Sequence, residues 1–355
     1  MFITKPSTQV HRPLQIGILG CANIAKQFAR DVAPSPQVKL VSVASRDINK
    51  AKEFAHQFSI PNAYGSYEAL LEDKTIDAVY IPLPNNMHAE WAIKAANAGK
   101  HILCEKPLTL TLASAKEMFQ AAKDNNVMLL EAYPYYFQPQ TGDMLSILNS
   151  GVIGKVRMVQ ACFGFTLPDN PHNIRLNPDL GGGALLDAGS YTMSVIRLVM
   201  GEAPSRVFAE SAWTDSGVDI STTAFLKFSD DRSANFSCAM NVANHRRATI
   251  CGSAGTIETE FLNHTSHQVT GHVYGYLPSQ MRLRRGTANT IGYEEIASEV
   301  GSGFRFAAEA FAKVVQERDF AAIDRAAHAS LDIAATLEAI QLSAKTNVWV
   351  DVESV

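Results

Sequence analysis

Short apolar segments alternate with helical patterns through the first third of the chain. The expected strands cover residues 14–19, 38–44, 77–83, 101–104 and 127–132, and the expected helices cover 24–32, 49–58, 89–98 and 112–123. Apolar strands separated by helices are typical of a parallel sheet that is buried on both faces. We therefore expect a doubly wound, Rossmann-type domain over residues 1–132.

The pattern changes after residue 132. Between residues 206 and 260, four or five segments have β-type character with no helix between them, which predicts an antiparallel sheet. The helices expected at 304–316 and 327–344 either cover that sheet or return to the first domain. The chain is therefore expected to be an α/β protein whose second domain, residues 133–355, carries an open, mostly antiparallel sheet and binds the substrate.

The composition is that of an ordinary globular protein, with 46% hydrophobic and 19% charged residues. A net charge of −4 without any basic run argues against a nucleic-acid or anionic-membrane partner. No apolar stretch approaches the roughly 20 residues of a membrane span, and residues 1–13 lack the apolar core of a signal peptide. The five cysteines include no C-x-x-C pair, so we expect reduced thiols and a cytoplasmic protein.

The first expected strand ends in Gly-Ile-Leu-Gly-Cys-Ala at residues 17–22, a G-x-x-G-x-A variant of the dinucleotide fingerprint. Glycine at this turn lets the backbone approach a pyrophosphate, which the amide donors and dipole of the following helix stabilise. We expect the cofactor to contact the turn and the helix start, at Gly17, Gly20, Ala22, Asn23 and Ile24.

The second expected strand ends in Ala-Ser-Arg at residues 44–46. An NAD site usually has an acid here for the ribose 2′-hydroxyl, whereas this chain has Ser45. Arg46 can pair with a 2′-phosphate through its planar guanidinium, so NADP(H) is favoured over NAD(H). The alternative is a solvated arginine, and the neighbouring Asp47 would weaken the preference.

Two more segments follow expected strands. Residues 81–88 form a proline-stiffened loop, and we expect Pro84, Asn85 and His88 to contact the cofactor. The alternative for Asn85 is capping of the next helix. The alternative for His88 is a buried ring whose hydrogen bonds are made within the protein. Residues 99–107 end in Glu105, Lys106 and a proline whose peptide bond can be cis. Ligands of a parallel sheet bind at the carboxyl ends of its strands, so Glu105 and Lys106 are cofactor candidates and Lys106 is also a catalytic candidate. The alternative is that the two side chains form a surface salt bridge.

Candidate substrate residues lie in the second half of the chain. Tyr133 and Tyr136 belong to an aromatic cluster at a strand end, which suits a sugar or ring pocket, although packing between domains is nearly as plausible. Phe163 lies on the strand expected at 154–165, and Arg175 lies in the polar loop that follows it.

A triple glycine at residues 181–183 precedes a helix that is expected to continue to Met200. Asp187 and Tyr191 are four residues apart and would share one helical face, which makes them catalytic candidates. A lone D-x-G-x-Y pattern is more often ordinary surface.

Five motifs together resemble the Gfo/Idh/MocA family, the group of glucose–fructose oxidoreductase and inositol dehydrogenase. They are G-x-x-G-x-A at 17–22, L-P-N-x-x-H at 83–88, E-K-P at 105–107, E-A-Y at 131–133 and G-G-G-A-L-L-D-x-G-x-Y at 181–191. The resemblance implies NAD(P) bound without a metal, and homodimers or homotetramers formed sheet to sheet. The family's catalytic lysine falls on Lys106, and Tyr191 replaces the histidine that many members carry.

Tyr191 places the chain near the branch of NADP-linked aldose dehydrogenases, dimeric dihydrodiol dehydrogenases and nucleotide-sugar 3-ketoreductases. The resemblance implies reversible hydride transfer between the nicotinamide and a carbinol or carbonyl carbon of a sugar or cyclic polyol. Tyr191 would carry the hydroxyl proton with help from Lys106, while Asp187 would orient Lys106 or the substrate; the reverse assignment of Lys106 and Tyr191 stays open.

The chain departs from these relatives at Pro134, Tyr136 and Gln138, which puts the substrate in doubt. A nucleotide-sugar 3-ketoreductase, with Arg175 meeting the diphosphate, and a trans-dihydrodiol dehydrogenase are the alternative enzymes. A non-catalytic NADP-binding regulator is the alternative of another class, and the presence of both Lys106 and Tyr191 argues against it.

Overall fold

The computed structural model describes residues 12–170 and 172–355, which divide into two compact units. The first unit comprises the described residues up to Thr109, together with Ala113–Phe137 and Ser302–Ser330. The second comprises Leu110–Leu112, Gln138–Gly301 and Leu331–Val355. The expected α/β class, with a parallel sheet followed by a largely antiparallel one, is confirmed.

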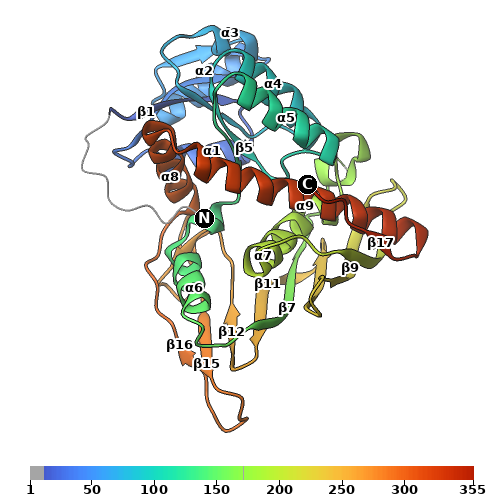
Figure 1. Cartoon of the computed structure of the whole chain (residues 1–355). Helices are drawn as coiled ribbons and strands as arrows, with labels where there is room; N and C mark the ends of the chain where they lie inside the picture. The colour runs from blue at the N-terminus through green and yellow to red at the C-terminus, as the bar shows by residue number, and fades with distance from the viewer. Residues whose placement is uncertain (1–11, 171) are drawn as a thin grey trace. The chain divides into compact units, whose positions relative to one another are not determined.

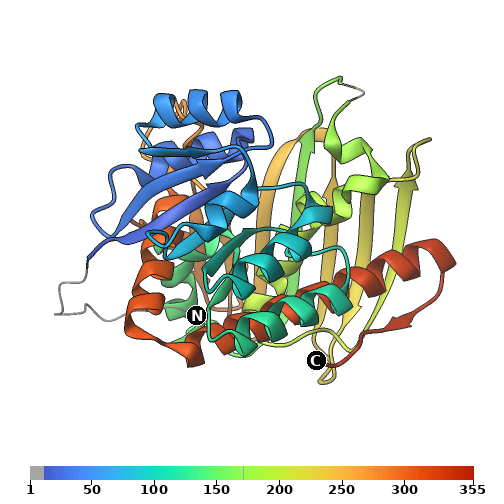
Figure 2. The ribbon, with the colours of Figure 1, turned by 90° about the horizontal axis from the view of Figure 1, so that it is seen from above.

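The first unit is built on a six-stranded, wholly parallel sheet (Figures 1 and 2). Its strands, in spatial order, are β3 (Asn62–Tyr64), β2 (Val38–Ala44), β1 (Leu14–Leu19), β4 (Ala78–Ile81), β5 (His101–Glu105) and β6 (Leu129–Ala132). The helices are α1 (Asn23–Val32), α2 (Ile48–Phe58), α3 (Tyr67–Glu72), α4 (His88–Asn97), α5 (Leu112–Asp124) and α8 (Gly303–Glu317), with short 3₁₀ turns η1 (Asn85–Met87) and η2 (Pro134–Phe137). This is the doubly wound arrangement that the strand–helix alternation predicts.

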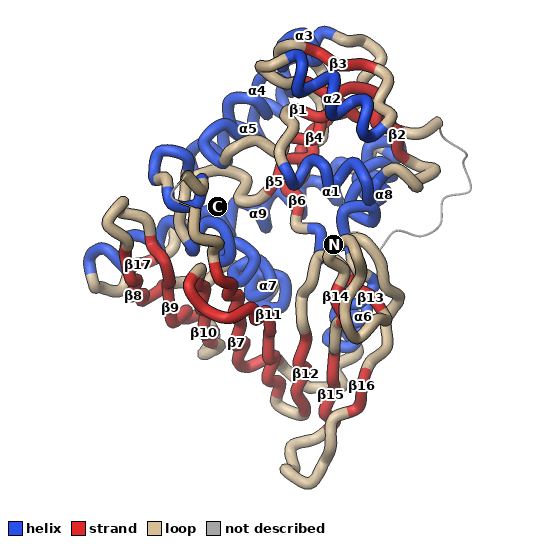
Figure 3. The backbone as a smooth tube through the Cα atoms, turned by 180° about the vertical axis from the view of Figure 1, so that it is seen from behind, coloured by secondary structure: helices blue, strands red, loops and turns tan. Residues whose placement is uncertain are grey.

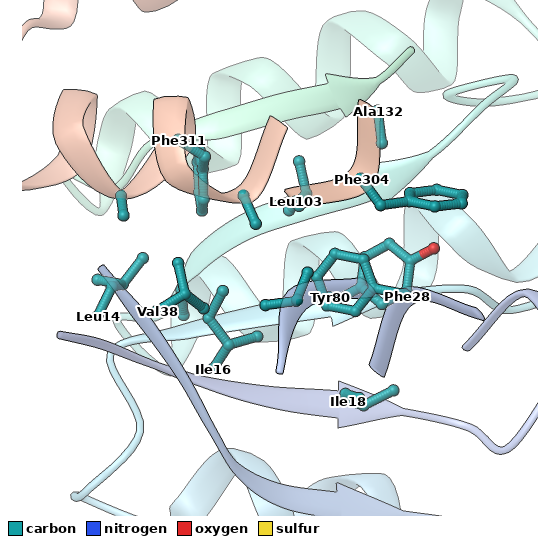
Figure 4. Close-up of a cluster of buried hydrophobic side chains, with 14 of the residues drawn as sticks. Leu14, Ile16, Ile18, Phe28, Val38, Tyr80, Leu103, Ala132, Phe304 and Phe311 are labelled. Carbon is teal, nitrogen blue, oxygen red and sulfur yellow. The ribbon is translucent and has the colours of Figure 1, made fainter. Parts of the chain in front are cut away.

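The core of the first unit lies between the sheet and helices α1, α2 and α8 (Figure 4). Ile16 and Ile18 point to this side because strand side chains alternate. The Phe28 ring of α1 stacks on Tyr80 of β4 with ring centroids 3.8 Å apart, and Phe304 of α8 meets Phe28 edge-on at 6.1 Å. Helix α8, more than 160 residues after β6, therefore completes the core of the dinucleotide-binding fold.

The second unit contains a nine-stranded sheet (Figures 1 and 3). Every strand pair in it is antiparallel except β10 with β7. The strands, in spatial order, are β16 (Glu294–Glu295), β15 (Met281–Arg285), β12 (Gly255–Thr259), β11 (Asn241–Gly252), β7 (Val156–Thr166), β10 (Ser233–Ala239), β9 (Asp219–Lys227), β8 (Arg206–Trp213) and β17 (Val350–Asp351).

Helices α6 (Pro139–Asn149) and α7 (Ser190–Met200) belong to the second unit, and α7 packs on β7 and β10 (Figure 3). Two short strands, β13 (Thr265–Ser266) and β14 (Leu277–Pro278), pair with each other between β12 and β15. Helix α9 (Phe320–Thr346) contributes its first turns to the first unit and the remainder to the second. Among the described residues, no helix combines the length and the apolarity that crossing a bilayer requires.

Candidate functional site

The turn after β1 is shaped for an anion. Gly20 has φ +109°, which residues with a side chain rarely adopt, and a Cβ there would lie 3.0 Å from Leu83 Cδ2. Helix α1 begins at Asn23 with no side-chain cap on its first amides and no acid in its first turn. Ala22, Asn23 and Ile24 are exposed. Because uncapped amides and the helix dipole attract negative charge, this turn fits the pyrophosphate of a dinucleotide.

Gly17 has a packing role. It is buried inside β1, and a Cβ on it would lie 2.8 Å from Leu70 Cδ2 of α3. A side chain at this position would push helix α3 off the sheet. Gly17 therefore serves helix–sheet packing, and its contact with the cofactor stays a prediction.

Cations gather at the end of β2 and the start of α1. Burial raises the pKa of Tyr67, and the nearby guanidinium of Arg46 opposes that shift. Burial likewise raises the pKa of Cys21, opposed by the ammonium groups of Lys26 and Lys50. A phosphate placed here would meet several positive charges, which suits a 2′-phosphate better than a bare ribose hydroxyl. Ser45 accepts the N–H of Asp47 through its Oγ at 3.2 Å.

His88 is enclosed between two loops. Its side chain is fully buried, with Nδ1 2.9 Å from the carbonyl oxygen of Pro107 and Nε2 2.8 Å from that of Leu83. Burial lowers its pKa, and the two carbonyl groups oppose that shift. The ring joins the loop after β4 to the loop after β5, and its contact with the cofactor stays a prediction. Pro84 and Asn85 are half-buried in the same loop, and their contact with the cofactor also stays a prediction.

The segment after β5 presents Lys106. The Lys106–Pro107 peptide bond is cis, and the Lys106 side chain is half-buried. Glu105 turns inward instead: it is 6% exposed, and one carboxylate oxygen accepts the Tyr80 hydroxyl at 2.6 Å. Glu105 therefore anchors the strand end, and its contact with the cofactor stays a prediction.

Glu131 is a buried acid near Lys106 whose importance sequence reasoning missed, although the E-A-Y motif contains it. One carboxylate oxygen accepts the N–H of Leu108 at 2.8 Å. Burial raises the Glu131 pKa to about 7, opposed by hydrogen bonds that include Ser330 and by the charge of Lys106. The loop that carries Lys106 is thus held by a carboxyl group that can release or take up a proton near neutral pH.

Of the two tyrosines expected at the substrate, Tyr133 is buried. It is 1% exposed, its ring lies 5.2 Å from that of Tyr136, and burial raises its pKa well above the ordinary value. A side chain enclosed in this way packs the fold, and the role of Tyr133 in the substrate pocket stays a prediction. Tyr136 is half-buried and remains a candidate.

The second unit brings Arg175 and Asp187 together. Arg175 Nε donates to Asp187 Oδ2 at 2.5 Å, and the guanidinium also lies 5.8 Å from the Phe165 ring. Close packing of the glycine loop makes this pairing possible: a Cβ on Gly182 would lie 2.5 Å from the carbonyl oxygen of Arg175. Asp187 itself sits in a π-helical turn, η5 (Leu185–Gly189), that precedes α7. Such turns are frequent at functional sites.

Tyr191, in the first turn of α7, is surrounded by side chains from β7, β11 and the segment after β12. The Phe163 ring meets it edge-on at 5.7 Å. Asn263 Nδ2 donates to the Tyr191 hydroxyl oxygen at 2.9 Å. Arg246 lies over the Tyr191 ring, 4.2 Å from its centroid. The phenol is therefore held from several sides within its own unit.

Arg246, Asn263 and His264 are site residues that sequence reasoning missed. The one available signal was alternation along β11, where Arg246 pairs in register with Phe163 and so faces the same side of the sheet. Nothing local marks Asn263, because it lies 72 residues after Tyr191 and outside the predicted strands and helices. Among the described residues, no cluster of three or more His, Cys, Asp or Glu side chains is arranged to hold a metal ion.

We expect His264 to make the protein sensitive to acid. Burial, reinforced by the charge of Arg246, lowers its pKa to about 4 from 6.5. Between these two pH values His264 binds a proton in the unfolded chain but not in the folded chain, so its contribution to stability falls as the pH drops from 6.5 towards 4. The free energy of unfolding should fall by about 2 kcal/mol between pH 7.5 and pH 5 from this group.

Urea unfolding at the two pH values measures this effect. Because burial raises the pKa of Glu131 to about 7, that acid changes stability with pH in the opposite sense, and the effect of His264 is read as a difference from the wild type. His264→Gln should lose about 2 kcal/mol less stability than the wild type between pH 7.5 and pH 5, whereas the same change at the exposed His267 should leave the wild-type dependence in place. Equal pH dependence in all three proteins would show that His264 is not the cause.

Two family models match the chain. One, described as an oxidoreductase family with an NAD-binding Rossmann fold, matches residues 14–133, and the other, the GFO/IDH/MocA C-terminal domain, matches residues 143–258. The NADP(+)-dependent D-xylose 1-dehydrogenase 2 of Haloferax volcanii is 33% identical over 341 residues, which is 96% of this chain and 100% of that protein. The chain belongs to the Gfo/Idh/MocA family of oxidoreductases. The expected family and the expected enzyme class are therefore confirmed.

Two solved structures are similar to this chain over nearly its whole length. A 3-ketoreductase from Actinomadura kijaniata, in complex with NADP and TDP-benzene, superimposes with a TM-score of 0.79 at 29% identity, covering 93% of this chain and 98% of that one. The aldose–aldose oxidoreductase of Caulobacter crescentus, complexed with glycerol, superimposes with a TM-score of 0.82 at 27% identity, covering 96% and 100%.

Proposed function

We propose that this Gfo/Idh/MocA protein is an NADP(H)-dependent oxidoreductase that transfers a hydride between the nicotinamide and a carbinol or carbonyl carbon of an aldose. The observation that carries the proposal is the environment of Tyr191, a phenol held at its oxygen by Asn263 and flanked by Arg246. A proton carrier among aromatic rings suits the oxidation of a sugar hydroxyl. The full-length relative from Haloferax volcanii, named as a D-xylose dehydrogenase, supports the choice of an aldose.

The cofactor is assigned to the first unit. Gly20 and the uncapped start of α1 would hold the pyrophosphate, Ser45 and Arg46 the 2′-phosphate, and Asn85 and Lys106 the nicotinamide end. When bound, NADP(H) supplies the hydride chemistry. The relatives named with NADP support this choice over NAD.

The residues of the chain move the proton. Tyr191 would take the proton of the sugar hydroxyl during oxidation and return it during reduction. The Lys106 ammonium would stabilise the phenolate or hold the reacting oxygen, since a cation favours the charged form of a neighbouring acid. Asp187, ion-paired with Arg175, would orient the substrate.

The pairing of Arg175 with Asp187 bears on the choice of substrate. Arg175 would have to meet the diphosphate of a nucleotide sugar, yet its guanidinium already faces a carboxylate at 2.5 Å. A neighbouring carboxylate repels a diphosphate and accepts hydrogen bonds from sugar hydroxyls. We therefore place an unmodified aldose first, with Tyr136, Phe163 and Arg175 as the lining residues. A nucleotide-sugar 3-ketoreductase is the second candidate because of the likeness to the Actinomadura enzyme.

A substrate screen tests the proposal. Formation of NADPH is followed by its near-ultraviolet absorbance with aldoses, inositols and cyclic diols, and its consumption with keto-sugars and nucleotide-linked ketosugars. Turnover of one or more aldoses with NADP is expected. Turnover confined to nucleotide-linked ketosugars would favour the second candidate, and no turnover with any of these substrates would contradict the proposed reaction.

We expect Arg46→Ala to weaken NADP without weakening NAD. Losing a charge-assisted contact to a phosphate costs about 1.5–3 kcal/mol, which corresponds to a rise of about 10- to 100-fold in the KM for NADP. Lys39→Ala, at an exposed position on β2, is the matched control and should change neither KM. A wild-type enzyme that prefers NAD, or an Arg46→Ala variant that weakens both cofactors equally, would contradict the assignment.

We further propose a cytoplasmic homodimer or homotetramer. Phe208, Phe225 and Trp349 are 37%, 41% and 44% exposed and contact one another across β8, β9 and the residue before β17, so they offer an apolar patch for a second copy. The free cysteines are consistent with a reducing compartment. Light scattering should give two or four times the 38.6 kDa of the chain, and Phe225→Glu should lower that mass. A wild-type mass of one chain would contradict the oligomer.

A further inference from the structure

We propose that Asn263 and Arg246 are positioning residues for Tyr191: Asn263 fixes the phenol oxygen as a hydrogen-bond acceptor, and the Arg246 guanidinium supports the charge that this oxygen carries once its proton has left. The inference rests on the proposed role of Tyr191. The inference goes beyond that role by naming the two side chains that help the Tyr191 phenol to release its proton.

The direction of the hydrogen bonds follows from the chemistry of the donors. Arg246 Nη2 lies 3.4 Å from Asn263 Oδ1, and a guanidinium can only donate. The amide of Asn263 must therefore turn its oxygen to Arg246 and its NH₂ to Tyr191, whose hydroxyl oxygen is 2.9 Å away. An amide NH₂ can only donate, so the phenol oxygen accepts and its own O–H proton must point elsewhere. The same bond strengthens when the oxygen becomes negative.

The charge of Arg246 acts in a half-buried, aromatic environment. Its guanidinium carbon lies 4.2 Å from the ring centroid of Tyr191 and 4.7 Å from those of Phe163 and Phe261. These rings take the place of some of the surrounding solvent, so the attraction between guanidinium and phenolate is weakened less than it would be between fully exposed groups. Arginine is the suitable residue because it stays charged at every working pH and stacks on rings.

Other ionisable groups near this cluster do not oppose the effect. His264, beside Arg246, has its pKa lowered to about 4 and is neutral at working pH. Asp187, one turn before Tyr191, is ion-paired with Arg175. Lys106, which the proposed mechanism also assigns to proton transfer, is unchanged in every variant below.

The strand itself provides a matched control. Arg246 pairs with Phe163 across β11 and β7, whereas the next residue, Arg247, pairs with Cys162, points to the opposite face of the sheet and is exposed. Arg247→Met therefore removes the same charge from the same strand without touching Tyr191.

The test measures kcat/KM for sugar oxidation against pH in Arg246→Met, Asn263→Leu, Arg246→Lys and Arg247→Met. We expect the acidic limb to move up by about one pH unit in the first two, because loss of a neighbouring cation or donor disfavours the phenolate. The activity lost near neutral pH, about 10-fold, should return at higher pH. Arg246→Lys should restore most of the profile, and Arg247→Met should match the wild type.

A second measurement does not depend on turnover. The protein is labelled with ¹³Cζ-tyrosine, and the Tyr191 resonance is assigned by its absence in Tyr191→Phe. Its titration midpoint should rise in Arg246→Met and in Asn263→Leu.

An unchanged midpoint and pH profile in folded variants would overturn the inference even if Tyr191→Phe is inactive. Full activity of Tyr191→Phe would instead overturn the proposed function, and the midpoints would still decide whether Arg246 and Asn263 act on this phenol. If Arg246→Met does not fold, Asn263→Leu and Arg246→Lys decide by the same criteria.

Discussion

Tyr191→Phe should lower kcat by about 10²-fold or more while leaving NADPH binding unchanged. The substitution removes only the hydroxyl that we assign to proton transfer, and a positioned acid or base contributes about 10²- to 10⁴-fold. The phenylalanine ring can keep the contacts with Phe163 and Arg246, so the surroundings should persist. Steady-state kinetics with saturating sugar gives kcat, and quenching of protein fluorescence by NADPH gives the affinity.

Tyr293→Phe is the control for this experiment. Tyr293 also has an arginine over its ring, since the guanidinium carbon of Arg284 lies 4.3 Å from its centroid, but it lies outside the assigned site. It should retain wild-type turnover. Undiminished kcat in Tyr191→Phe would remove Tyr191 from the mechanism and leave Lys106 as the proton carrier.

Lys106→Met is the second large effect that we expect, again a loss of about 10²-fold or more in kcat. Methionine keeps an unbranched apolar chain but has no ammonium group to stabilise a phenolate or a reacting oxygen. The fold should survive, because the neighbouring buried acid, Glu131, has a pKa raised to about 7 and can take up a proton when its cation is removed. Circular dichroism should therefore match the wild type.

Lys94→Met controls for the loss of a lysine. Lys94 is exposed and pairs with Glu90 at 2.6 Å on the surface of α4, where such pairs contribute little. It should keep full activity. If Lys106→Met retained wild-type turnover while Tyr191→Phe lost it, the proton path would run through Tyr191 without the lysine.

The elements of the first unit followed closely from local pattern. β1 and β2 have the predicted bounds, and helices α1, α2, α4 and α5 begin and end within one residue of expectation, because strand and helix periods are written in neighbouring residues. The pair β3 and α3 escaped notice, since a strand of three residues carries too little periodicity to recognise.

Burial separated the candidates that local pattern had grouped together. Gly17, His88, Glu105 and Tyr133 all stand in or beside family motifs, yet each is enclosed and occupied by packing or hydrogen bonds. Whether a side chain at a strand end faces solvent or the interior depends on which helix lies over it. Motif and spacing alone do not supply that information.

The sequence by itself determined the Rossmann start and the family, and it supplied Lys106 and Tyr191 as the predicted reactive side chains, because each rests on residues that are close together in the chain. Only the tertiary structure decided that α8 completes the first core, that Arg175 pairs with Asp187, and that Arg246 and Asn263 hold Tyr191. These contacts join residues from 12 to more than 270 positions apart. Such partners are chosen by the packing of whole elements, and no local pattern encodes that choice.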